Sequence, residues 1–300
     1  MPAGGMAWIE DARLMRTDEI VRLARLMVGL GVHDVRITGG EPLARRDLVD
    51  VVGALAALPG VAEVSMTTNG VLLADHADNL VAAGLGRVNV SMDSLDPVRF
   101  HRITRRDDLE RALSGLAALE RHPRLGPIKV NAVLVRGLSE DDVLPLADLA
   151  RARPYVVRFI EAMPIDAGRE WRRDDVIAGA EVRAMIARRW PLEPMTRERP
   201  SAPAERWRFA DGAGEVQFVS SVTAPFCAAC DRLRLTADGR LRTCLFSETE
   251  TDMLGPLRAG ADDEELAAIA RTAVAAKPPG HGIGREGWSY GGRPMSMIGG

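Results

Sequence analysis

The chain has 300 residues, of which 46% are hydrophobic, and a chain of this length buries roughly three-quarters of the surface that its unfolded form exposes. Its net charge of −3 argues against nucleic acid as a partner, because phosphate backbones require a basic face. There is no apolar run of about 18 residues for a membrane span and no secretory signal pattern. We therefore expect a cytoplasmic protein that contacts neither nucleic acid nor membrane.

Helical patterns alternate with short β-branched runs from residue 17 to about 163. The first helix is expected to begin with Thr17 as its cap and to close with a glycine. Such alternation predicts βαβ units and a parallel sheet, either doubly wound or part of a (β/α) barrel, with its chemistry at the carboxyl ends of the strands. The expected strands are 33–40, 61–70, 86–94, 128–137 and 155–163; the expected helices are 17–30, 45–58, 75–84, 108–122 and 139–152.

Polar side chains collect where these strands end. "ITGGEPL" (37–43) follows the first strand, and its glycines either make a tight turn or let the main chain approach a ligand. Lys129 shares one face of its strand with Asn131 and Val133, so it is either an interior cation or a surface lysine. The other candidates at or past strand ends are Asn69, Ser91, Asp93, Glu161 and Met163.

The second half is expected to contain a proline-rich, exposed connector, then a β-rich cysteine segment, a helix near 262–275 and a tail rich in glycine and proline. The sequence "PLEPMTRERPSAPAERW" (191–207) carries the connector. We accordingly divide the chain into a barrel part (1–190), a connector (191–215) and a C-terminal segment (216–300).

All the cysteines lie in one C-x2-C-x13-C pattern, Cys227, Cys230 and Cys244. An Asp-Gly turn between the second and third cysteine could bring the third thiol alongside the first two. A structural zinc would need a fourth ligand, and His281 is the nearest downstream histidine. The alternatives are ordinary buried thiols, or an iron–sulfur cluster with one iron left open to a substrate.

Arg232 and Arg234 alternate directly after Cys230 and would point to one face of a strand. Two arginines on a strand are commonly a solvated face. Beside a metal cluster they would suit a phosphorylated substrate, because guanidinium forks match phosphate geometry.

Seven motifs in order, "RITGGEP", "TTNG", "NVSMDS", "KVNAV", "RFIEAM", "FCAACDRLRLTADGRLRTCLF" and "MSMIGG", resemble the GTP 3′,8-cyclase family of radical S-adenosylmethionine (SAM) enzymes. The resemblance implies an α/β fold, an incomplete (β/α)6 TIM-like barrel of the radical SAM type with a C-terminal cluster-binding segment. It also implies conversion of GTP to (8S)-3′,8-cyclo-7,8-dihydroguanosine 5′-triphosphate in molybdenum cofactor biosynthesis. In the family, a 5′-deoxyadenosyl radical takes hydrogen from the ribose 3′ carbon, which then attacks carbon 8 of the same guanine.

The resemblance also assigns site residues by position. SAM would contact Gly40, Ser91 and Met163, with Glu41 in the loop that holds its methionyl amine. The cysteines would hold a 4Fe–4S cluster whose free iron binds guanine, beside Arg232 and Arg234 as catalytic residues. The positions that would bind GTP are Arg36, Thr67, Lys129, Arg232, Leu233 and Arg234.

One family feature has no counterpart in these 300 residues: the C-x3-C-x2-C loop of the SAM-cleaving cluster and the strand before it. In the family, Met-Pro follows the third cysteine, and this sequence starts with Met1-Pro2. We therefore expect a truncated N-terminus, an unpaired edge at 33–40, and a second 4Fe–4S cluster in a full-length form only. Reductive formation of 5′-deoxyadenosine by this chain would contradict that expectation. The alternatives are an inactive GTP-binding homologue and a zinc-stabilised α/β scaffold.

The expected partners are GTP, SAM, an electron donor such as a flavodoxin system, cyclic pyranopterin monophosphate synthase as the next enzyme, and a second copy in a homodimer. In the family, a tail that ends in two glycines inserts towards the active site. Trimming Gly299 and Gly300 should then lower cyclisation while leaving the clusters intact.

Overall fold

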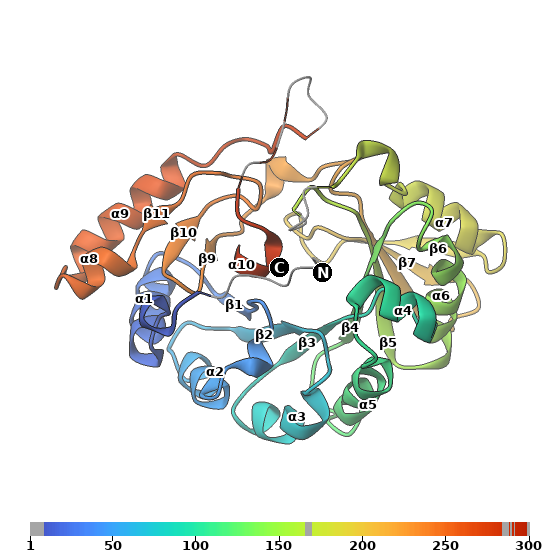
Figure 1. Ribbon diagram of the computed structural model, residues 1–300, viewed down its shortest axis with the longest axis horizontal. Coiled ribbons are helices and arrows are strands. Elements are labelled where there is room, and N and C mark those ends of the chain that lie inside the picture. The colour runs from blue at the N-terminus through green and yellow to red at the C-terminus, as the bar shows by residue number, and fades with distance from the viewer. Residues whose placement is uncertain (1–8, 166–169, 284–287, 289, 291, 299–300) are drawn as a thin grey trace.

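The computed structural model describes residues 9–165, 170–283, 288, 290 and 292–298. Its centre is an eight-stranded sheet in the order β1-β2-β3-β4-β5-β8-β7-β6, which curves into an incomplete barrel (Figure 1). The first six strands in that order are parallel, and β7 and β6 are antiparallel. Their bounds are β1 (Asp34–Ile37), β2 (Glu63–Thr68), β3 (Arg87–Ser91), β4 (Ile128–Leu134), β5 (Tyr155–Glu161), β8 (Glu215–Val219), β7 (Glu205–Phe209) and β6 (Leu192–Met195).

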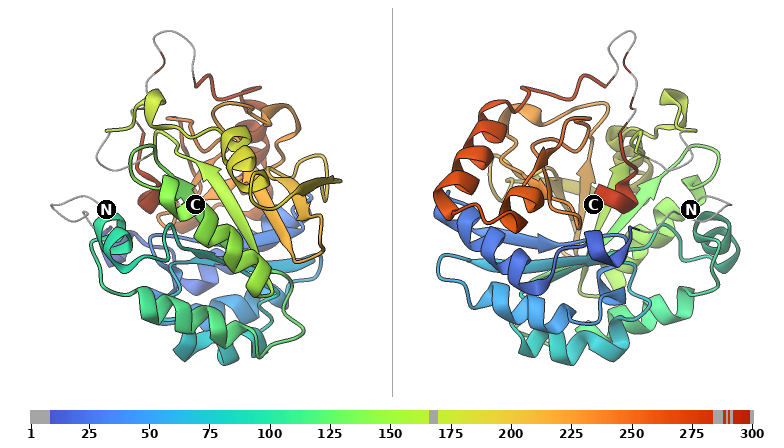
Figure 2. Two further views of the ribbon diagram at one scale, coloured as in Figure 1. Left: turned by 90° about the vertical axis from the view of Figure 1, so that its right-hand side faces the viewer. Right: turned by 60° about the vertical axis from the view of Figure 1, so that its left-hand side comes forward.

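Helices cover the outer side of this sheet (Figures 1 and 2). Side chains alternate along each strand, so Val130 and Ala132 of β4 are fully buried against the helices while Lys129 and Asn131 face the barrel interior. The helices of this half are α1 (Thr17–Gly29), α2 (Leu48–Ala56), α3 (Leu73–Ala82), α4 (Pro97–Thr104), α5 (Leu109–Leu119), α6 (Val143–Ala152) and α7 (Gly179–Ala187). Short 3-10 turns lie at Asp11–Arg13, Pro42–Ala44, Glu140–Asp142, Arg173–Asp175 and Cys227–Ala229.

The C-terminal segment adds a small sheet in the order β11-β10-β9. It packs on α1 through a second apolar core, in which Leu23 and Leu26 meet Leu241, Met253 and Leu266. The segment therefore stands beside β1, at the open side of the barrel (Figure 2). Its elements are β9 (Arg234–Leu235), β10 (Arg240–Arg242), β11 (Thr251–Asp252), α8 (Leu254–Arg258), α9 (Asp263–Ala275) and α10 (Met295–Ile298).

The five expected strands, the five helices between them and the helix near 262–275 are confirmed within a few residues at each end. The expected strand edge is confirmed too, because β1 lies at one end of the sheet and pairs with β2. None of the helices in the described residues is long and apolar enough to cross a membrane.

Two local predictions are wrong. Thr17 is the first helical residue rather than the cap: the N-cap is Arg16, whose backbone N–H donates to Glu19 Oε2 at 2.8 Å, while the Thr17 hydroxyl donates to Asp47. The expected connector forms β6 and β7, since Phe209 is buried in the core while flanking arginines pair with glutamates on neighbouring strands. The division at 1–190, 191–215 and 216–300 stays a prediction.

Candidate active site

The inner face of the barrel carries four cations from four strands: Arg36 of β1, Arg87 of β3, Lys129 of β4 and Arg158 of β5. We call these four residues the cationic wall. Lys129 is 3% exposed and Arg158 is 9% exposed. The alternative of a surface lysine at position 129 is therefore wrong, and the interior lysine is confirmed.

The cations of the wall perturb one another. Burial, followed by the charges of Arg158 and Arg87, lowers the pKa of Lys129 to about 8. Burial and the charges of Arg36 and Arg87 lower the pKa of Arg158 to about 10, with Glu198 opposing the shift. Arg36 keeps a solvent-accessible side chain, yet burial and its neighbours Arg87 and Arg232 lower its pKa as well. Arg87 pairs with Glu63 at 2.5 Å and Lys129 pairs with Glu198 at 3.4 Å, so the four cations of the wall face two paired carboxylates among the described residues, which suits a polyanionic ligand.

Polar atoms without partners lie on the same inner face. Within the described part of the chain, Asn89 Oδ1, Asn131 Oδ1 and Arg87 Nε are buried and make no hydrogen bond. The Asn89 side-chain amide donates to Thr67 Oγ1 at 3.2 Å. Buried polar atoms normally have partners, so these exceptions point to a ligand in the barrel.

The cysteine segment adds two further cations, Arg232 and Arg234, to this interior. β9 and β10 form the predicted hairpin, in which Arg242 lies opposite Arg234 and Gly239 has a φ of +71° in the Asp-Gly turn. Burial, then the charges of Arg232, Arg36 and Arg242, lowers the pKa of Arg234 to about 10. The hairpin therefore brings Arg234 close to β1, and the predicted GTP residues from both halves of the chain meet.

The three cysteines are free, half-buried thiols. Burial opposes ionisation of Cys230, but the backbone N–H and guanidinium of Arg232, with Lys277, lower its thiol pKa overall. Lys277 Nζ lies 3.7 Å from Cys230 Sγ and donates to the Arg232 carbonyl at 2.9 Å. A stabilised thiolate is the form that ligates iron, so this donor set fits a cluster.

A zinc site with His281 does not fit. The ring accepts a hydrogen bond from the Ile283 N–H at 3.0 Å through Nδ1, and Nε2 donates to the Ser221 carbonyl at 3.0 Å. Burial lowers the pKa of His281, so the ring is neutral with both nitrogens engaged. In the described ranges, no three His, Cys, Asp or Glu side chains are placed together to hold a metal ion, so a cluster on the three cysteines is supported by their spacing and thiol chemistry.

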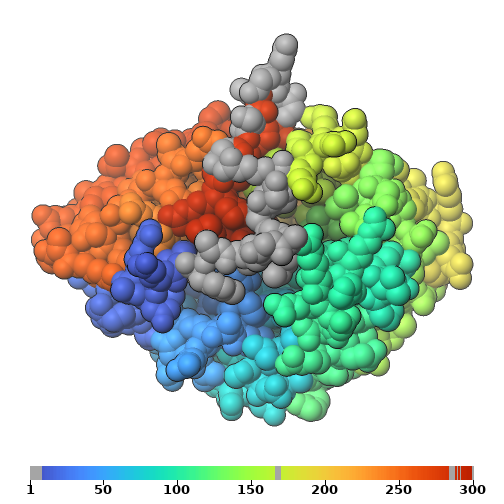
Figure 3. All heavy atoms as spheres, in the orientation of Figure 1, coloured from blue at the N-terminus to red at the C-terminus, as the bar shows by residue number. Residues whose placement is uncertain are grey.

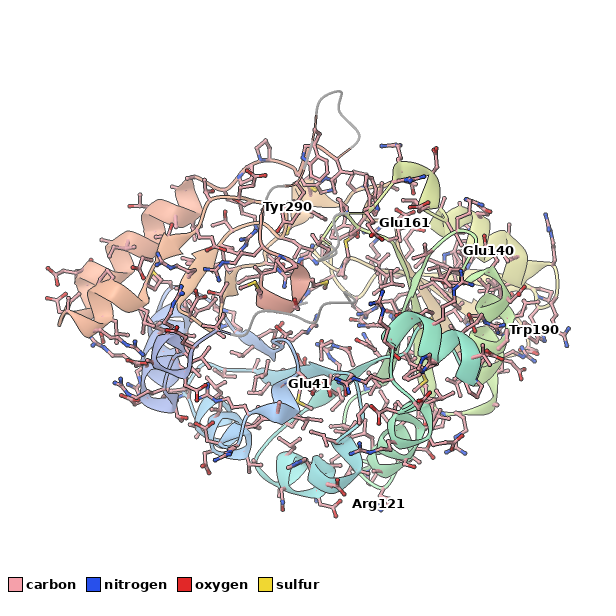
Figure 4. All side chains as sticks on the ribbon, viewed as in Figure 1. Glu41, Arg121, Glu140, Glu161, Trp190 and Tyr290 are labelled. Atoms are coloured by element: carbon pink, nitrogen blue, oxygen red, sulfur yellow. The ribbon has the colours of Figure 1, made fainter. Side chains whose placement is uncertain are left out.

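The loop after β1 forms one side of the predicted SAM site. Glu41 accepts hydrogen bonds from the Leu43 N–H at 3.0 Å, the Thr68 hydroxyl at 2.7 Å and the Asn69 N–H at 2.8 Å. Figure 4 shows Glu41 beside the end of β2. Its carboxylate ties the loop to β2, which leaves the main chain at Gly40 exposed at the barrel mouth.

The other predicted SAM residues lie at the ends of β3 and β5. Ser91 is exposed as the last residue of β3. Met163 follows β5 and packs against Val176, Val222 and Ile283. All the predicted SAM positions therefore lie at the carboxyl ends of parallel strands.

Two carboxylates at strand ends accept hydrogen bonds from backbone N–H groups of neighbouring segments and thereby stabilise the fold. Glu161 is 2% exposed and accepts from the N–H groups of Gly179, Val222 and Thr223 at 2.8 to 3.0 Å, so it joins β5 to α7 and to the chain that leads to the cysteines (Figure 4). Asp93 accepts from the Val133 N–H at 2.8 Å, and burial raises its pKa to about 6.

The C-terminal helix α10 reaches the mouth of the barrel. Met295 N–H donates to the Ile165 carbonyl at 3.0 Å, and a side chain at Gly40 would lie 3.5 Å from the Ser296 carbonyl. In Figure 3 these red residues lie in the middle of the visible face, beside the orange segment. Gly299 and Gly300 are outside the described residues.

Sequence reasoning missed Arg87, Arg158, Gln217 and Lys277. Arg158 alternates with buried core residues, as Lys129 does, so the same strand pattern could have found it. Lys277 is one of two lysines, and Gln217 is the only glutamine in the sequence. Arg87 gave no comparable signal.

Comparisons with known proteins match the whole chain. The family models "Radical SAM superfamily" and "Molybdenum Cofactor Synthesis C" match residues 3–150 and 155–283. The chain is 48% identical over 305 residues to a GTP 3′,8-cyclase of Mycolicibacterium smegmatis, covering 100% of this chain and 84% of that protein. It is 46% identical over 302 residues to a GTP 3′,8-cyclase of Streptomyces coelicolor, covering 100% and 88%.

A solved structure of a radical SAM enzyme, coproporphyrinogen III oxidase from Escherichia coli, aligns with a TM-score of 0.41 at 15% identity. The alignment covers 57% of this chain and 45% of that one. The family assignment rests on the full-length relatives instead.

Proposed function

Because this chain belongs to the GTP 3′,8-cyclase family of radical SAM enzymes, we propose that it cyclises GTP to (8S)-3′,8-cyclo-7,8-dihydroguanosine 5′-triphosphate in molybdenum cofactor biosynthesis. One observation carries the proposal: the cationic wall and the cysteine hairpin supply cations to the same interior, since the charge of Arg232 helps to lower the pKa of Arg36 and the charge of Arg36 helps to lower the pKa of Arg234.

The two ends of this interior suit the two ends of GTP. The triphosphate would lie against Arg36, Lys129 and Arg158, whose same-sign charges its oxygens would offset. The guanine would lie at the open iron of a 4Fe–4S cluster on Cys227, Cys230 and Cys244. Arg232, Leu233 and Arg234 would lie between the two ends and hold the middle of the nucleotide, while Thr67 and Asn89, which are hydrogen-bonded to each other, would supply polar contacts from β2 and β3.

In a form that carries the SAM-cleaving cluster, bound SAM would supply the radical that removes hydrogen from the ribose 3′ carbon. This chain's own residues would do the positioning. Gly40, Ser91 and Met163 would hold SAM at the barrel mouth, above the wall. Clamping GTP at base and triphosphate fixes the ribose in one conformer, so that carbon 3′ and carbon 8 of the same molecule can meet.

We extend the proposal to a cytoplasmic location, a flavodoxin-type electron donor, cyclic pyranopterin monophosphate synthase as the next enzyme, and a homodimer. The barrel part (1–190), connector (191–215) and C-terminal segment (216–300) remain our division of the chain.

The test is to reconstitute the chain anaerobically with iron and sulfide and to record the EPR spectrum of the reduced cluster before and after GTP is added. We expect iron and sulfide in equal amounts and a spectrum that GTP changes, since guanine would bind the open iron. Cys244→Ala should abolish the signal. A preparation that holds zinc alone, or a spectrum indifferent to GTP, would contradict the proposed site.

A second candidate is a GTP-binding homologue that does not cleave SAM, which is favoured by the presence of three cysteines in the 300 residues. The DNA upstream of the Met1 codon separates the two, because an in-frame C-x3-C-x2-C there would supply the SAM-cleaving cluster. A form that carries this motif should make 5′-deoxyadenosine and cyclised nucleotide from GTP, SAM and reductant, whereas the homologue would make neither.

A further inference from the structure

A buried amide lies beside one cation of the wall. Gln217 of β8 is 2% exposed, and its Oε1 accepts from Arg158 Nε at 3.0 Å and from Arg158 Nη2 at 2.9 Å. Its Nε2 donates to Glu215 Oε1 at 2.7 Å. These contacts fix the orientation of the amide, because the reverse orientation would place its NH2 group against a guanidinium.

The carboxylate beyond the amide already has a cation of its own. Arg206 of β7 donates to Glu215 through Nε at 2.8 Å and through Nη2 at 2.7 Å, a bidentate ion pair. The network therefore runs Arg206–Glu215–Gln217–Arg158, with two positive charges and one negative charge. Its net positive charge lies at the Arg158 end.

A carboxylate at position 217 would pair with Arg158 and cancel its charge, as Glu215 does for Arg206. A glutamine accepts the same two hydrogen bonds and leaves the guanidinium fully charged, even though burial and the neighbouring arginines make that charge costly. The two hydrogen bonds to Gln217 engage the Nε and Nη2 edge of the Arg158 guanidinium, so the Nη1 edge is turned away from Gln217.

Glu198 is the other carboxylate near this part of the wall. It is half-exposed and accepts from Lys129 Nζ at 3.4 Å, and among the contacts of the described residues it accepts no hydrogen bond from Arg158. Gln217 is therefore the side chain that sets the direction of the Arg158 guanidinium.

We propose that Gln217 is a positioning residue that aims Arg158 at the phosphates of the nucleotide without neutralising it, and thereby makes the site selective for nucleotides with more phosphates. The inference rests on the proposed function, in which the triphosphate lies along the wall.

The test compares binding of GTP, GDP and GMP to the reconstituted protein by calorimetry at pH 8. In the wild type, affinity should fall as phosphates are removed. Gln217→Glu adds a carboxylate at nearly constant size. We expect it to weaken GTP binding by roughly tenfold, the value of a charged hydrogen bond, to weaken GDP binding by less and to change GMP binding little. Gln217→Leu should also weaken GTP binding, because the Arg158 guanidinium loses its hydrogen-bond acceptor.

A double-mutant cycle separates positioning from a structural effect. Gln217→Glu should have no further effect on GTP binding in an Arg158→Gln background, since there is no guanidinium left to neutralise. Arg208→Gln, which also lowers the net charge by one but does so at an exposed side chain on the outer surface, controls for net charge, and thermal melts check that each variant folds.

The outcomes distinguish the two proposals. A wild type that binds GMP as tightly as GTP would overturn both the triphosphate site and the role of Gln217. If the wild type prefers GTP, two results would overturn the role of Gln217 alone. One is that Gln217→Glu lowers the affinity for all three nucleotides by the same factor; the other is that it lowers the affinity for GTP equally in the Arg158→Gln background.

Discussion

Buried charges in the barrel differ from those in the C-terminal segment. In the barrel, the cationic wall consists of side chains of one sign, and burial and the neighbouring cations lower the pKa values of Arg36, Lys129 and Arg158. In the segment, Arg242 is 1% exposed and pairs with Glu250, while Arg293 donates two hydrogen bonds to Asp238, both at 2.8 Å. We call the residues Asp238, Arg242, Glu250 and Arg293 the polar latch.

Each cation of the latch has a carboxylate partner, whereas the wall has more cations than carboxylates. Although burial opposes it, Arg293 helps to lower the pKa of Asp238 to about 2, and Arg293 also approaches Glu250 at 3.1 Å. Buried charge with a counter-ion holds a segment in place, whereas buried charge with too few counter-ions favours a bound ligand of opposite sign. Changes in the latch should therefore affect stability, and changes in the wall should affect binding.

The largest effect is expected for Arg242→Leu. This change leaves the partly buried Glu250 carboxylate without its main partner and removes the contacts that the buried Arg242 makes with the carbonyls of Leu245 and Ser247. We expect the free energy of unfolding to fall by about 3–5 kcal/mol, as measured by denaturant titration of the reconstituted protein.

Arg240→Ala is the matched control on the same strand. Arg240 pairs with Asp252 at 3.4 Å, and both side chains are more than a third exposed, so this variant should lose less than about 1 kcal/mol. Equal losses for the two variants would contradict the assignment of Arg242 to a buried latch.

The next effect is expected for Lys129→Met, which replaces a cation of the wall with an apolar side chain of similar length. GTP binding should weaken by roughly 10- to 100-fold, because a charged contact to phosphate is lost. Stability should stay constant or rise, since one repulsive charge leaves the interior. Calorimetry with GTP and a thermal melt give the two values, with Arg208→Ala on the outer surface as the control. If Lys129→Met loses stability but still binds GTP normally, then Lys129 stabilises the fold, as Arg242 does, and does not bind the nucleotide.

The two regions also differ in how well the sequence predicts them. The barrel strands follow from alternation, because positions 128, 130, 132 and 134 must be apolar to pack against helices, and Lys129 then faces inward. Neither Arg158–Gln217 nor Asp238–Arg293 follows from a local pattern. Their partners are 59 and 55 residues apart in the chain and meet through the order of the sheet and the path of the C-terminus.

The same limit explains the errors at the cap and the connector. Thr17 has the residue type of a helix cap, but its hydroxyl donates to Asp47, the residue that precedes α2. The connector has the composition of a loop, but its arginines find glutamates on adjacent strands. In both cases, the partner that decides the structure lies elsewhere in the chain.

The pH dependence should separate binding from stability at Lys129. Its folded-state pKa of about 8 lies below the ordinary value of 10.5, so between these values the unfolded state binds more protons and the free energy of unfolding rises with pH. GTP affinity should fall by several-fold between pH 7 and 9, because the folded protein loses that charge. The difference between wild type and Lys129→Met isolates both slopes from other titrating groups. Parallel pH profiles in the two proteins would show that Lys129 keeps its charge over this range.

The smallest effect is expected at Glu198, which brings a carboxylate to the wall, as Glu63 does at Arg87. It lies in the β6–β7 loop, contacts Lys129 at 3.4 Å and is 46% exposed, and the next residue, Arg199, ties the loop to Asp34 at 2.6 Å. Since a half-exposed pair contributes at most about 1 kcal/mol, Glu198→Gln should tighten GTP by no more than about fivefold, by removing an anion that competes with phosphate for the lysine. Asp34→Asn, which changes the outer contact of the same loop, should leave the affinity near the wild-type value. If Glu198→Gln instead weakens GTP, and does so only when Mg²⁺ is present, then the carboxylate binds the metal of the nucleotide and the wall carries its own counter-ion by design.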